Sequence, residues 1–148
     1  MGVLGEEALA AGGHVIGVAP RRLVERELVR NSLSELHVVE TMQERKSMMA
    51  ELSDGFIALP GGFGTLDELF EMLTWTQLGF HRKPCALLDA KGYFERLIEF
   101  LDYAVEQRFV TAAHRAMLIV ERDADILLDR LAVERPPESG KWMGRGPA

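Results

Sequence analysis

The chain has 148 residues, a length that fits one domain able to bury about two thirds of the surface that its unfolded form would expose. Hydrophobic residues make up 47% and charged residues 27%, which excludes a disordered chain, and no apolar run approaches the roughly 18 residues of a membrane span. The net charge of −6 argues against a broad nucleic-acid surface, although a small basic pocket remains compatible with it.

Helix and strand patterns alternate along the chain. In the first part, helical periodicity covers residues 3–11 and 41–53, and short β-branched runs cover 14–20 and 36–40. Three further strand patterns and three helical patterns follow, namely strands at 55–60, 84–89 and 116–120 and helices at 65–78, 93–107 and 123–133. Five nearly continuous apolar strands separated by helices predict a mostly parallel sheet covered on both faces, a Rossmann-like three-layer α/β fold.

The two ends of the chain differ from this regular pattern. We expect one domain, residues 1–133, followed by a loose tail, 134–148, because the tail contains Pro136, Pro137 and three glycines without periodicity. A doubly wound sheet normally opens with a strand, whereas this chain opens in a helical pattern. We therefore expect the fold to be N-terminally incomplete.

The first residues and the cysteine content indicate the cellular compartment of the protein. The start, MGVLGEE, has neither the basic beginning nor the apolar middle of a secretory signal peptide. The single cysteine, Cys85, can form no internal disulfide and offers no metal cluster, which is typical of a reducing compartment. We expect a cytoplasmic protein in which Cys85 is a buried core residue.

The segment LPGGFGTLDE, residues 59–68, places Gly61, Gly62 and Gly64 between a predicted strand and a predicted helix. In open α/β sheets this edge is where ligands bind. Glycine permits backbone angles and close approach that side chains forbid, so N–H groups can point at an anion while the helix dipole adds its positive end. The segment predicts a phosphate cradle, although it lacks the lysine of a P-loop.

The same segment also has a purely structural interpretation. A glycine-rich turn can simply lead into a helix, and Thr65 and Glu68 have the spacing of a capping box, in which the Glu68 carboxylate reaches back to the Thr65 N–H. Spacing alone leaves both interpretations open.

A second informative segment is TMQERKSMMAEL, which begins at Thr41. Thr41 and Glu44 form another capping-box pattern. Arg45 lies three residues after Met42 and four before Met49, so it shares the apolar stripe of this helix. An inward-facing arginine needs an anionic partner, which is either a ligand or a structural carboxylate, unless its stem snorkels to the surface.

Metal and nucleophile patterns are not found in the sequence. The four histidines are scattered without metal-ligand spacing, and no G-x-S-x-G segment is present; the histidines are His14, His37, His81 and His114. We expect these histidines to be surface or strand-end residues and expect no metal site.

Taken together, RK in MQERKSMM, PGGFGTLDE and TWTQLGFHRKP resemble the Lonely Guy (LOG) family of cytokinin riboside 5′-monophosphate phosphoribohydrolases, whose signature is P-G-G-x-G-T-x-x-E. The resemblance extends from Met1 to about Leu131. It implies a Rossmann-type homodimer that hydrolyses the N-glycosidic bond of a purine or cytokinin nucleoside 5′-monophosphate, releasing free base and ribose 5-phosphate. It implies no cofactor.

The resemblance also implies roles for individual residues. It makes Arg45 and Glu68 the catalytic pair. A carboxylate near the ribose stabilises oxocarbenium-like charge or orients the attacking water, and an arginine holds the phosphate or ribose or assists the departing base. The implied substrate-contact positions are Glu27, Lys46, Gly61, Gly62, Phe63, Gly64, Thr65, Leu66, Asp67 and Thr74.

Two alternatives to the enzyme stay open. One is a nucleotide-binding module of the same fold without turnover. The presence of Arg45 and Glu68 favours the enzyme, whereas the family's upstream strands, including a glycine-rich segment, have no counterpart here, which favours the module. The other is a structural α/β domain whose capping boxes explain both motifs. Proteins of this family have often been labelled lysine decarboxylases, but the sequence has no Ser-x-His-Lys pattern of the kind that a pyridoxal-phosphate lysine occupies.

An expectation about assembly comes from the predicted helix 65–78. Met72, Trp75 and Leu78 lie beyond its main apolar stripe and exceed what one core-facing side requires. We therefore expect a homodimer that forms through this helix.

Overall fold

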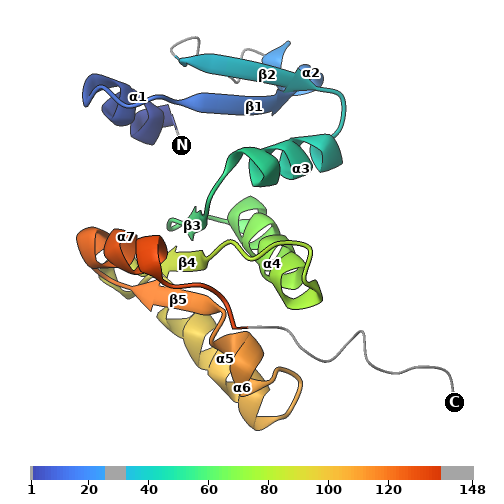
Figure 1. Ribbon diagram of the computed structural model, residues 1–148, viewed down its shortest axis with the longest axis vertical. Helices are drawn as coiled ribbons and strands as arrows, with labels where there is room; N and C mark the ends of the chain where they lie inside the picture. Colours follow the sequence, from blue (N-terminus) through green and yellow to red (C-terminus); the bar gives the residue numbers. More distant parts are fainter. Residues whose placement is uncertain (1, 26–32, 138–148) are drawn as a thin grey trace, which may run out of the picture. The chain divides into compact units, whose positions relative to one another are not determined.

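A computed structural model describes residues 2–25 and 33–137 (Figure 1). The chain separates into two compact units, Met1–Ser53 and Asp54–Ala148, and each unit is described by itself. In the described part of the chain, no helix is long and apolar enough to cross a membrane.

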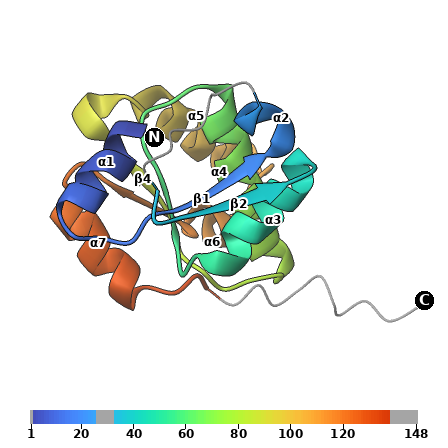
Figure 2. The same cartoon turned by 90° about the horizontal axis from the view of Figure 1, so that it is seen from above.

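The first unit is built on two parallel strands. Strand β1 (Ile16–Pro20) pairs with β2 (Glu35–Val39), with Ile16 opposite Glu35 and Pro20 opposite Val39, and Figure 2 shows the two strands side by side. The helices of this unit are α1 (Gly2–Ala10), α2 (Arg21–Val24) and α3 (Met42–Leu52).

Helix α1 ends in a Schellman motif, as the Gly12-Gly13 pair predicts. Gly12 adopts a left-handed φ of 81°, its N–H donates to the Leu9 carbonyl at 2.9 Å, and the Gly13 N–H donates to the Ala8 carbonyl at 2.8 Å. A residue with a Cβ atom would be strained at Gly12, so the glycine fixes the point at which this helix stops.

The second unit contains a three-stranded parallel sheet in the order β3-β4-β5. Its strands are β3 (Phe56–Ala58), β4 (Cys85–Leu88) and β5 (Leu118–Glu121). The connecting and following elements are α4 (Phe63–Leu78), the 3₁₀ turn η1 (Ala90–Gly92), α5 (Glu95–Glu106), α6 (Ala112–Arg115) and α7 (Ala124–Val133). Each parallel crossover therefore carries a helix, as parallel pairing requires.

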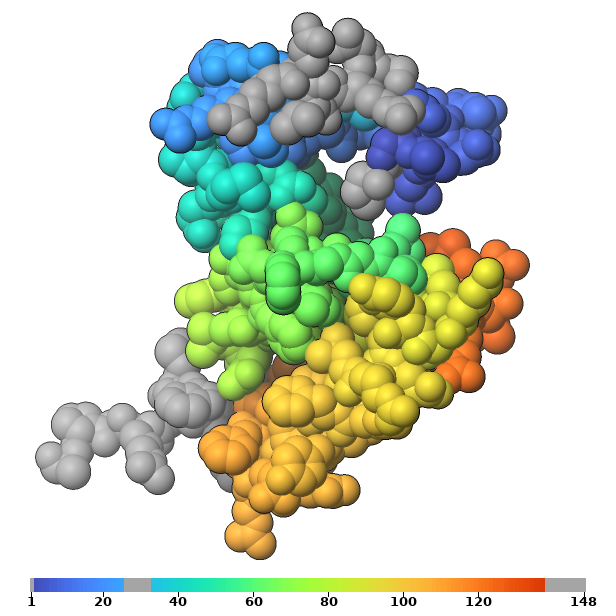
Figure 3. Space-filling view, turned by 180° about the vertical axis from the view of Figure 1, so that it is seen from behind, coloured from blue at the N-terminus to red at the C-terminus, as the bar shows by residue number. Residues whose placement is uncertain are grey.

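Successive side chains of the strands point to opposite faces of this sheet, and both faces are covered. Leu87 packs with Leu69 of α4 and Phe94 on one face, whereas Ala86 packs with Leu127 of α7 on the other. Figure 1 shows α5 and α7 on opposite sides of β4 and β5, and Figure 3 shows α4 in green beside α5 in yellow to orange. The unit is a three-layer α/β/α sandwich.

The predicted α/β class with parallel strands is confirmed. The predicted strands and long helices are present with ends shifted by one or two residues, while the short α2, η1 and α6 were not predicted. The strands form a two-stranded parallel sheet, β1-β2, in the first unit and a three-stranded parallel sheet, β3-β4-β5, in the second.

The predicted tail is described as far as Pro137. Arg130 of α7 holds Glu134, with 3.0 Å between Nη2 and Oε2, and the side chain of Pro136 is buried. The remainder, 138–148, lies outside the described residues, so the loose tail and the single domain over 1–133 both stay predictions.

Candidate active site

The glycine loop lies at the carboxyl edge of the second unit's sheet. Strand β3 ends at Ala58, and α4 begins at Phe63 with Gly62 as its N-cap residue, at φ −95° and ψ −151°. The N–H groups of the first helical turn have no acceptor within their own helix, and Gly62 has no side chain to cap them. These N–H groups, together with the helix dipole, form a positive end that suits an anion.

The three loop glycines serve different purposes. The left-handed backbone angles expected of them are not found: in the described ranges, the glycines with a positive φ are Gly12, Gly79 and Gly92. At Gly61 an added Cβ would collide with the Thr65 hydroxyl, so that position must be glycine for internal packing. At Gly62 and Gly64 an added Cβ would meet nothing within 4 Å, so both positions border open space.

The capping-box interpretation of Glu68 is wrong. Helix α4 starts two residues earlier than predicted, which makes Thr65 its third residue and Glu68 its sixth. Thr65 is therefore not the N-cap residue that a Thr65–Glu68 capping box requires, and Glu68 lies half-buried in the second turn.

The second capping box is confirmed with one modification. The Thr41 hydroxyl accepts a hydrogen bond from the Glu44 N–H at 3.1 Å, as predicted for the start of α3. The Glu44 carboxylate accepts from the Glu40 N–H at 2.9 Å, one residue before the expected Thr41 N–H. Side chains therefore cap the N–H groups at the start of α3, whereas the N-cap residue of α4 is a glycine.

A hollow of about 430 Å³ lies along α4. Its lining residues are Leu66, Asp67, Phe70, Glu71, Thr74 and Trp75. Three predicted substrate contacts, Leu66, Asp67 and Thr74, thus share one surface, since positions three and four apart lie on one side of a helix. The Thr74 hydroxyl donates to the Phe70 carbonyl at 2.7 Å, which leaves its oxygen able to accept a hydrogen bond from a ligand.

The remaining predicted site residues belong to the first unit. Arg45 of α3 is half-buried, and its Nε donates to the Val18 carbonyl of β1 at 3.1 Å, so one of its partners is a backbone oxygen. Lys46 is also half-buried. Because the two units are described separately, the pairing of Arg45 with Glu68 stays a prediction, and Glu27 lies outside the described residues.

Cys85 and His81 both lie in or near the core of the second unit. Cys85 is 1% exposed, and burial raises its pKa to about 11, so it is a protonated core residue, as predicted. Burial, aided by the charge of Lys83, lowers the pKa of His81, whose Nδ1 lies 3.2 Å from the Lys83 N–H. Within residues 2–25 and 33–137, no three His, Cys, Asp or Glu side chains are grouped to hold a metal.

Sequence reasoning missed a polar network at the same sheet edge. Tyr93 donates from its hydroxyl to the Gly61 carbonyl at 2.8 Å. Asp89, at the end of β4, accepts from the Phe94 N–H at 2.7 Å and from Arg122 Nε at 3.2 Å. The sequence offered one signal, the position of the two residues. Asp89 ends one predicted strand and Arg122 lies two residues after another, and the carboxyl ends of parallel strands meet at one edge of a sheet.

Comparisons with known proteins identify the family of the chain. The model of a family described as possible lysine decarboxylase matches residues 1–131. A cytokinin riboside 5′-monophosphate phosphoribohydrolase of Rhodococcoides fascians is 47% identical over 126 residues, 84% of this chain and 64% of the relative. One of Arabidopsis thaliana is 44% identical over 136 residues, 92% of this chain and 63% of the relative.

The chain belongs to this family, the LOG family that the PGGFGTLDE segment indicates. It spans 63% to 64% of the length of these two relatives. Their names describe phosphoribohydrolases, enzymes that act on cytokinin riboside 5′-monophosphate.

Proposed function

We propose that this protein hydrolyses the N-glycosidic bond of purine or cytokinin nucleoside 5′-monophosphates and releases free base and ribose 5-phosphate. The observation that carries the proposal is the uncapped start of α4 within an intact PGGFGTLDE segment. Open space beside Gly62 and Gly64 leaves room for a phosphate against the N–H groups of the first turn. The names of the relatives supply the nucleotide class.

In the proposed reaction the 5′-phosphate binds at the start of α4, and the ribose lies towards the second turn, which carries Glu68. As the bond from C1′ to the base nitrogen breaks, positive charge develops on the ribose. The Glu68 carboxylate stabilises that charge and orients the water that adds to C1′, while the base departs with a proton. Arg45 is assigned to the phosphate or ribose, or to the departing base.

The test is incubation of the purified chain with AMP and, separately, with isopentenyladenosine monophosphate, followed by chromatography for free base. Release of base and ribose 5-phosphate from either nucleotide is the expected result. Tight nucleotide binding without free base would instead identify a binding module. Adenosine is the matched control, because it lacks the phosphate and should bind much more weakly than AMP by calorimetry.

A homodimer also belongs to this proposal. Met72 does not support it as expected, because its side chain is only 6% exposed. Support comes from Leu78 and Phe80 at the end of α4, which are 48% and 72% exposed. Light scattering at micromolar concentration should give twice the chain mass, and a monomer would contradict the dimer.

A cytoplasmic location is the last part of the proposal. It is supported by the single buried cysteine, which needs no oxidising compartment. Fractionation of cells that make the tagged protein should place it with cytoplasmic markers.

A further inference from the structure

Tyr93 is the side chain that connects the loop after β4 to the glycine loop. Its hydroxyl donates to the Gly61 carbonyl at 2.8 Å, across 32 positions of the sequence. Both residues belong to the unit Asp54–Ala148. The contact joins two loops at the sheet edge to which the phosphate is assigned.

The hydrogen bond fixes the direction of a particular amide. In a planar trans peptide the carbonyl of one residue and the N–H of the next point in opposite directions, and the described peptide bonds include no cis bond. With the Gly61 carbonyl held by Tyr93, the Gly62 N–H points away from Tyr93. Because both residues are glycines, this peptide could otherwise rotate at little cost.

Tyr93 is itself held on a rigid support. The backbone before it turns through left-handed angles at Lys91 and Gly92, with φ of 57° and 73°. Asp89, whose side chain is 2% exposed, accepts from the Phe94 N–H at 2.7 Å. The Tyr93 and Phe94 rings meet edge to face with centroids 4.9 Å apart. The residues on both sides of Tyr93 are therefore fixed.

A salt-bridge chain strengthens that support. Arg122, which follows β5, donates from Nε to Asp89 at 3.2 Å and from Nη2 to Glu95 at 2.9 Å. The carboxylates on either side of the loop are thus bridged by one guanidinium. Asp89 is almost fully buried, and a buried carboxylate is stable only when such partners satisfy it.

We propose that Tyr93 is a positioning residue for the nucleotide phosphate: it orients the Gly61–Gly62 peptide so that the amides of the glycine loop converge on the phosphate. This inference rests on the proposed function for its ligand. It assigns Tyr93 no contact with the reacting atoms, so its effect falls on binding and not on bond cleavage.

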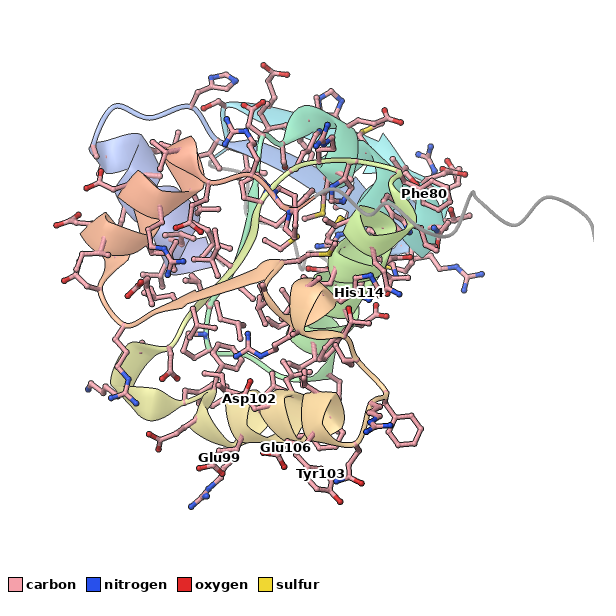
Figure 4. All side chains as sticks on the ribbon, turned by 60° about the horizontal axis from the view of Figure 1, so that its bottom comes forward. Phe80, Glu99, Asp102, Tyr103, Glu106 and His114 are labelled. Carbon is pink, nitrogen blue, oxygen red and sulfur yellow. The ribbon has the colours of Figure 1, made fainter. Side chains whose placement is uncertain are left out.

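The experiment compares Tyr93→Phe with the parent chain. The substitution removes the hydroxyl and keeps the ring against Phe94. The matched control is Tyr103→Phe on α5, because the chain has two tyrosines and Figure 4 shows Tyr103 projecting away from its helix. Hydrogen exchange of amides 61–66 is measured by NMR, and AMP hydrolysis is measured in parallel.

For Tyr93→Phe we expect several-fold faster exchange at amides 61–66 and a KM for AMP raised about fivefold, the size of one neutral hydrogen bond. The kcat should stay within twofold of the parent value. The lost interaction binds the ground state and the transition state equally, so its loss raises KM and leaves kcat unchanged. Loss of folded protein alone would lower kcat and leave KM unchanged. Tyr103→Phe should match the parent in both measurements.

Unchanged exchange at amides 61–66 overturns the inference whatever the activity. Faster exchange with an unchanged KM in an active parent also overturns it, because the loop would then not need Tyr93 to bind phosphate. If the parent releases no base from AMP, the proposed function fails, while the exchange comparison still decides whether Tyr93 holds the loop.

Discussion

Helices α4 and α7 begin at the same edge of one sheet, but their N-terminal N–H groups are capped differently. Each is the next helix after a strand, β3 or β5, and in each the N–H groups of the first turn have no acceptor within the helix. At α7 the Asp123 carboxylate accepts from the N–H groups of Asp125 and Ile126, both at 3.0 Å. At α4 the corresponding residue is Gly62, which has no side chain.

The two N-cap residues have different consequences, one for folding stability and the other for ligand binding. A capping side chain satisfies the helix within the chain and contributes about 1 kcal/mol to folding. A glycine at the same position forgoes most of that contribution and leaves the N–H groups to an external anion. Of two equivalent helix starts, one is therefore used for folding and the other is available for binding.

The sixth residue of each helix extends the comparison. This residue is Glu68 in α4 and Asp129 in α7, so both helices carry a carboxylate one turn after the start. Glu68 is half-buried, whereas Asp129 is exposed. If the start of α4 binds the substrate phosphate, Glu68 lies on the helix nearest the ribose, whereas Asp129 lies on a helix that binds no substrate.

The largest expected effect is at Glu68. Glu68→Gln should lower turnover on AMP at least about a hundredfold, about 2.7 kcal/mol of barrier, because the neutral amide no longer stabilises charge on the ribose. Stability should change by no more than about 1 kcal/mol, measured by thermal melting. Initial rates of base release measure the effect, and AMP binding by calorimetry should persist.

Asp129→Asn is the matched control for Glu68→Gln. It makes the same chemical change at the same position of α7 and should leave turnover at the parent value. Near-parental turnover in Glu68→Gln would remove Glu68 from the catalytic assignment, and an equal loss in both variants would point to a general effect of charge.

The next largest effect should come from giving α4 the kind of cap that α7 has. Gly62→Asp fits sterically, since a Cβ there meets nothing within 4 Å. Its carboxylate would occupy the free N–H groups and repel a phosphate, so AMP affinity should fall at least about tenfold, about 1.4 kcal/mol. The melting temperature should stay the same or rise slightly, because aspartate caps a helix a few tenths of a kcal/mol better than glycine.

Gly62→Ala is the control for this substitution, because it fills the same space without charge or acceptor. AMP affinity measured by calorimetry should fall much less for alanine than for aspartate. Equal losses in the two variants would show that bulk, and not occupation of the N–H groups, weakens binding.

Removing the cap of α7 should lower stability and leave turnover unchanged, the opposite of the result expected for Gly62→Asp. Asp123→Ala frees two N–H groups and should lower the free energy of unfolding by about 1–2 kcal/mol, measured by urea denaturation. Turnover per folded molecule should not change, and Asp123→Asn should retain most of the stability because asparagine caps equally well. A turnover loss with unchanged stability would contradict the division between the two helices.

The smallest effect is expected at α3, where Thr41 accepts one N–H and not two. Thr41→Ala should lower the free energy of unfolding by about 0.5–1 kcal/mol, and Thr41→Ser should restore it because serine retains the hydroxyl. Thermal melting of the three chains measures the difference. A loss in Thr41→Ala larger than in Asp123→Ala would indicate that the number of capped N–H groups does not set the contribution.

Local patterns in the sequence determined the identity and order of the main elements. The strands, the long helices, the stop of α1 at Gly12 and the cap at Thr41 all depend on residues within a few positions of one another, and the structure confirms them. The PGGFGTLDE segment likewise identified the family, because its spacing is contiguous in sequence.

Tertiary structure decided the details that depend on distant residues. Met72 was expected on an open surface, but the folded chain buries it to 6% exposure. The start of α4 at Phe63 places Glu68 beyond the first turn, and a glycine cap carries no side-chain signal from which that start could be read. Tyr93 reaches Gly61 across 32 positions, a contact that only the pairing of β3 with β4 brings about and that no local periodicity encodes.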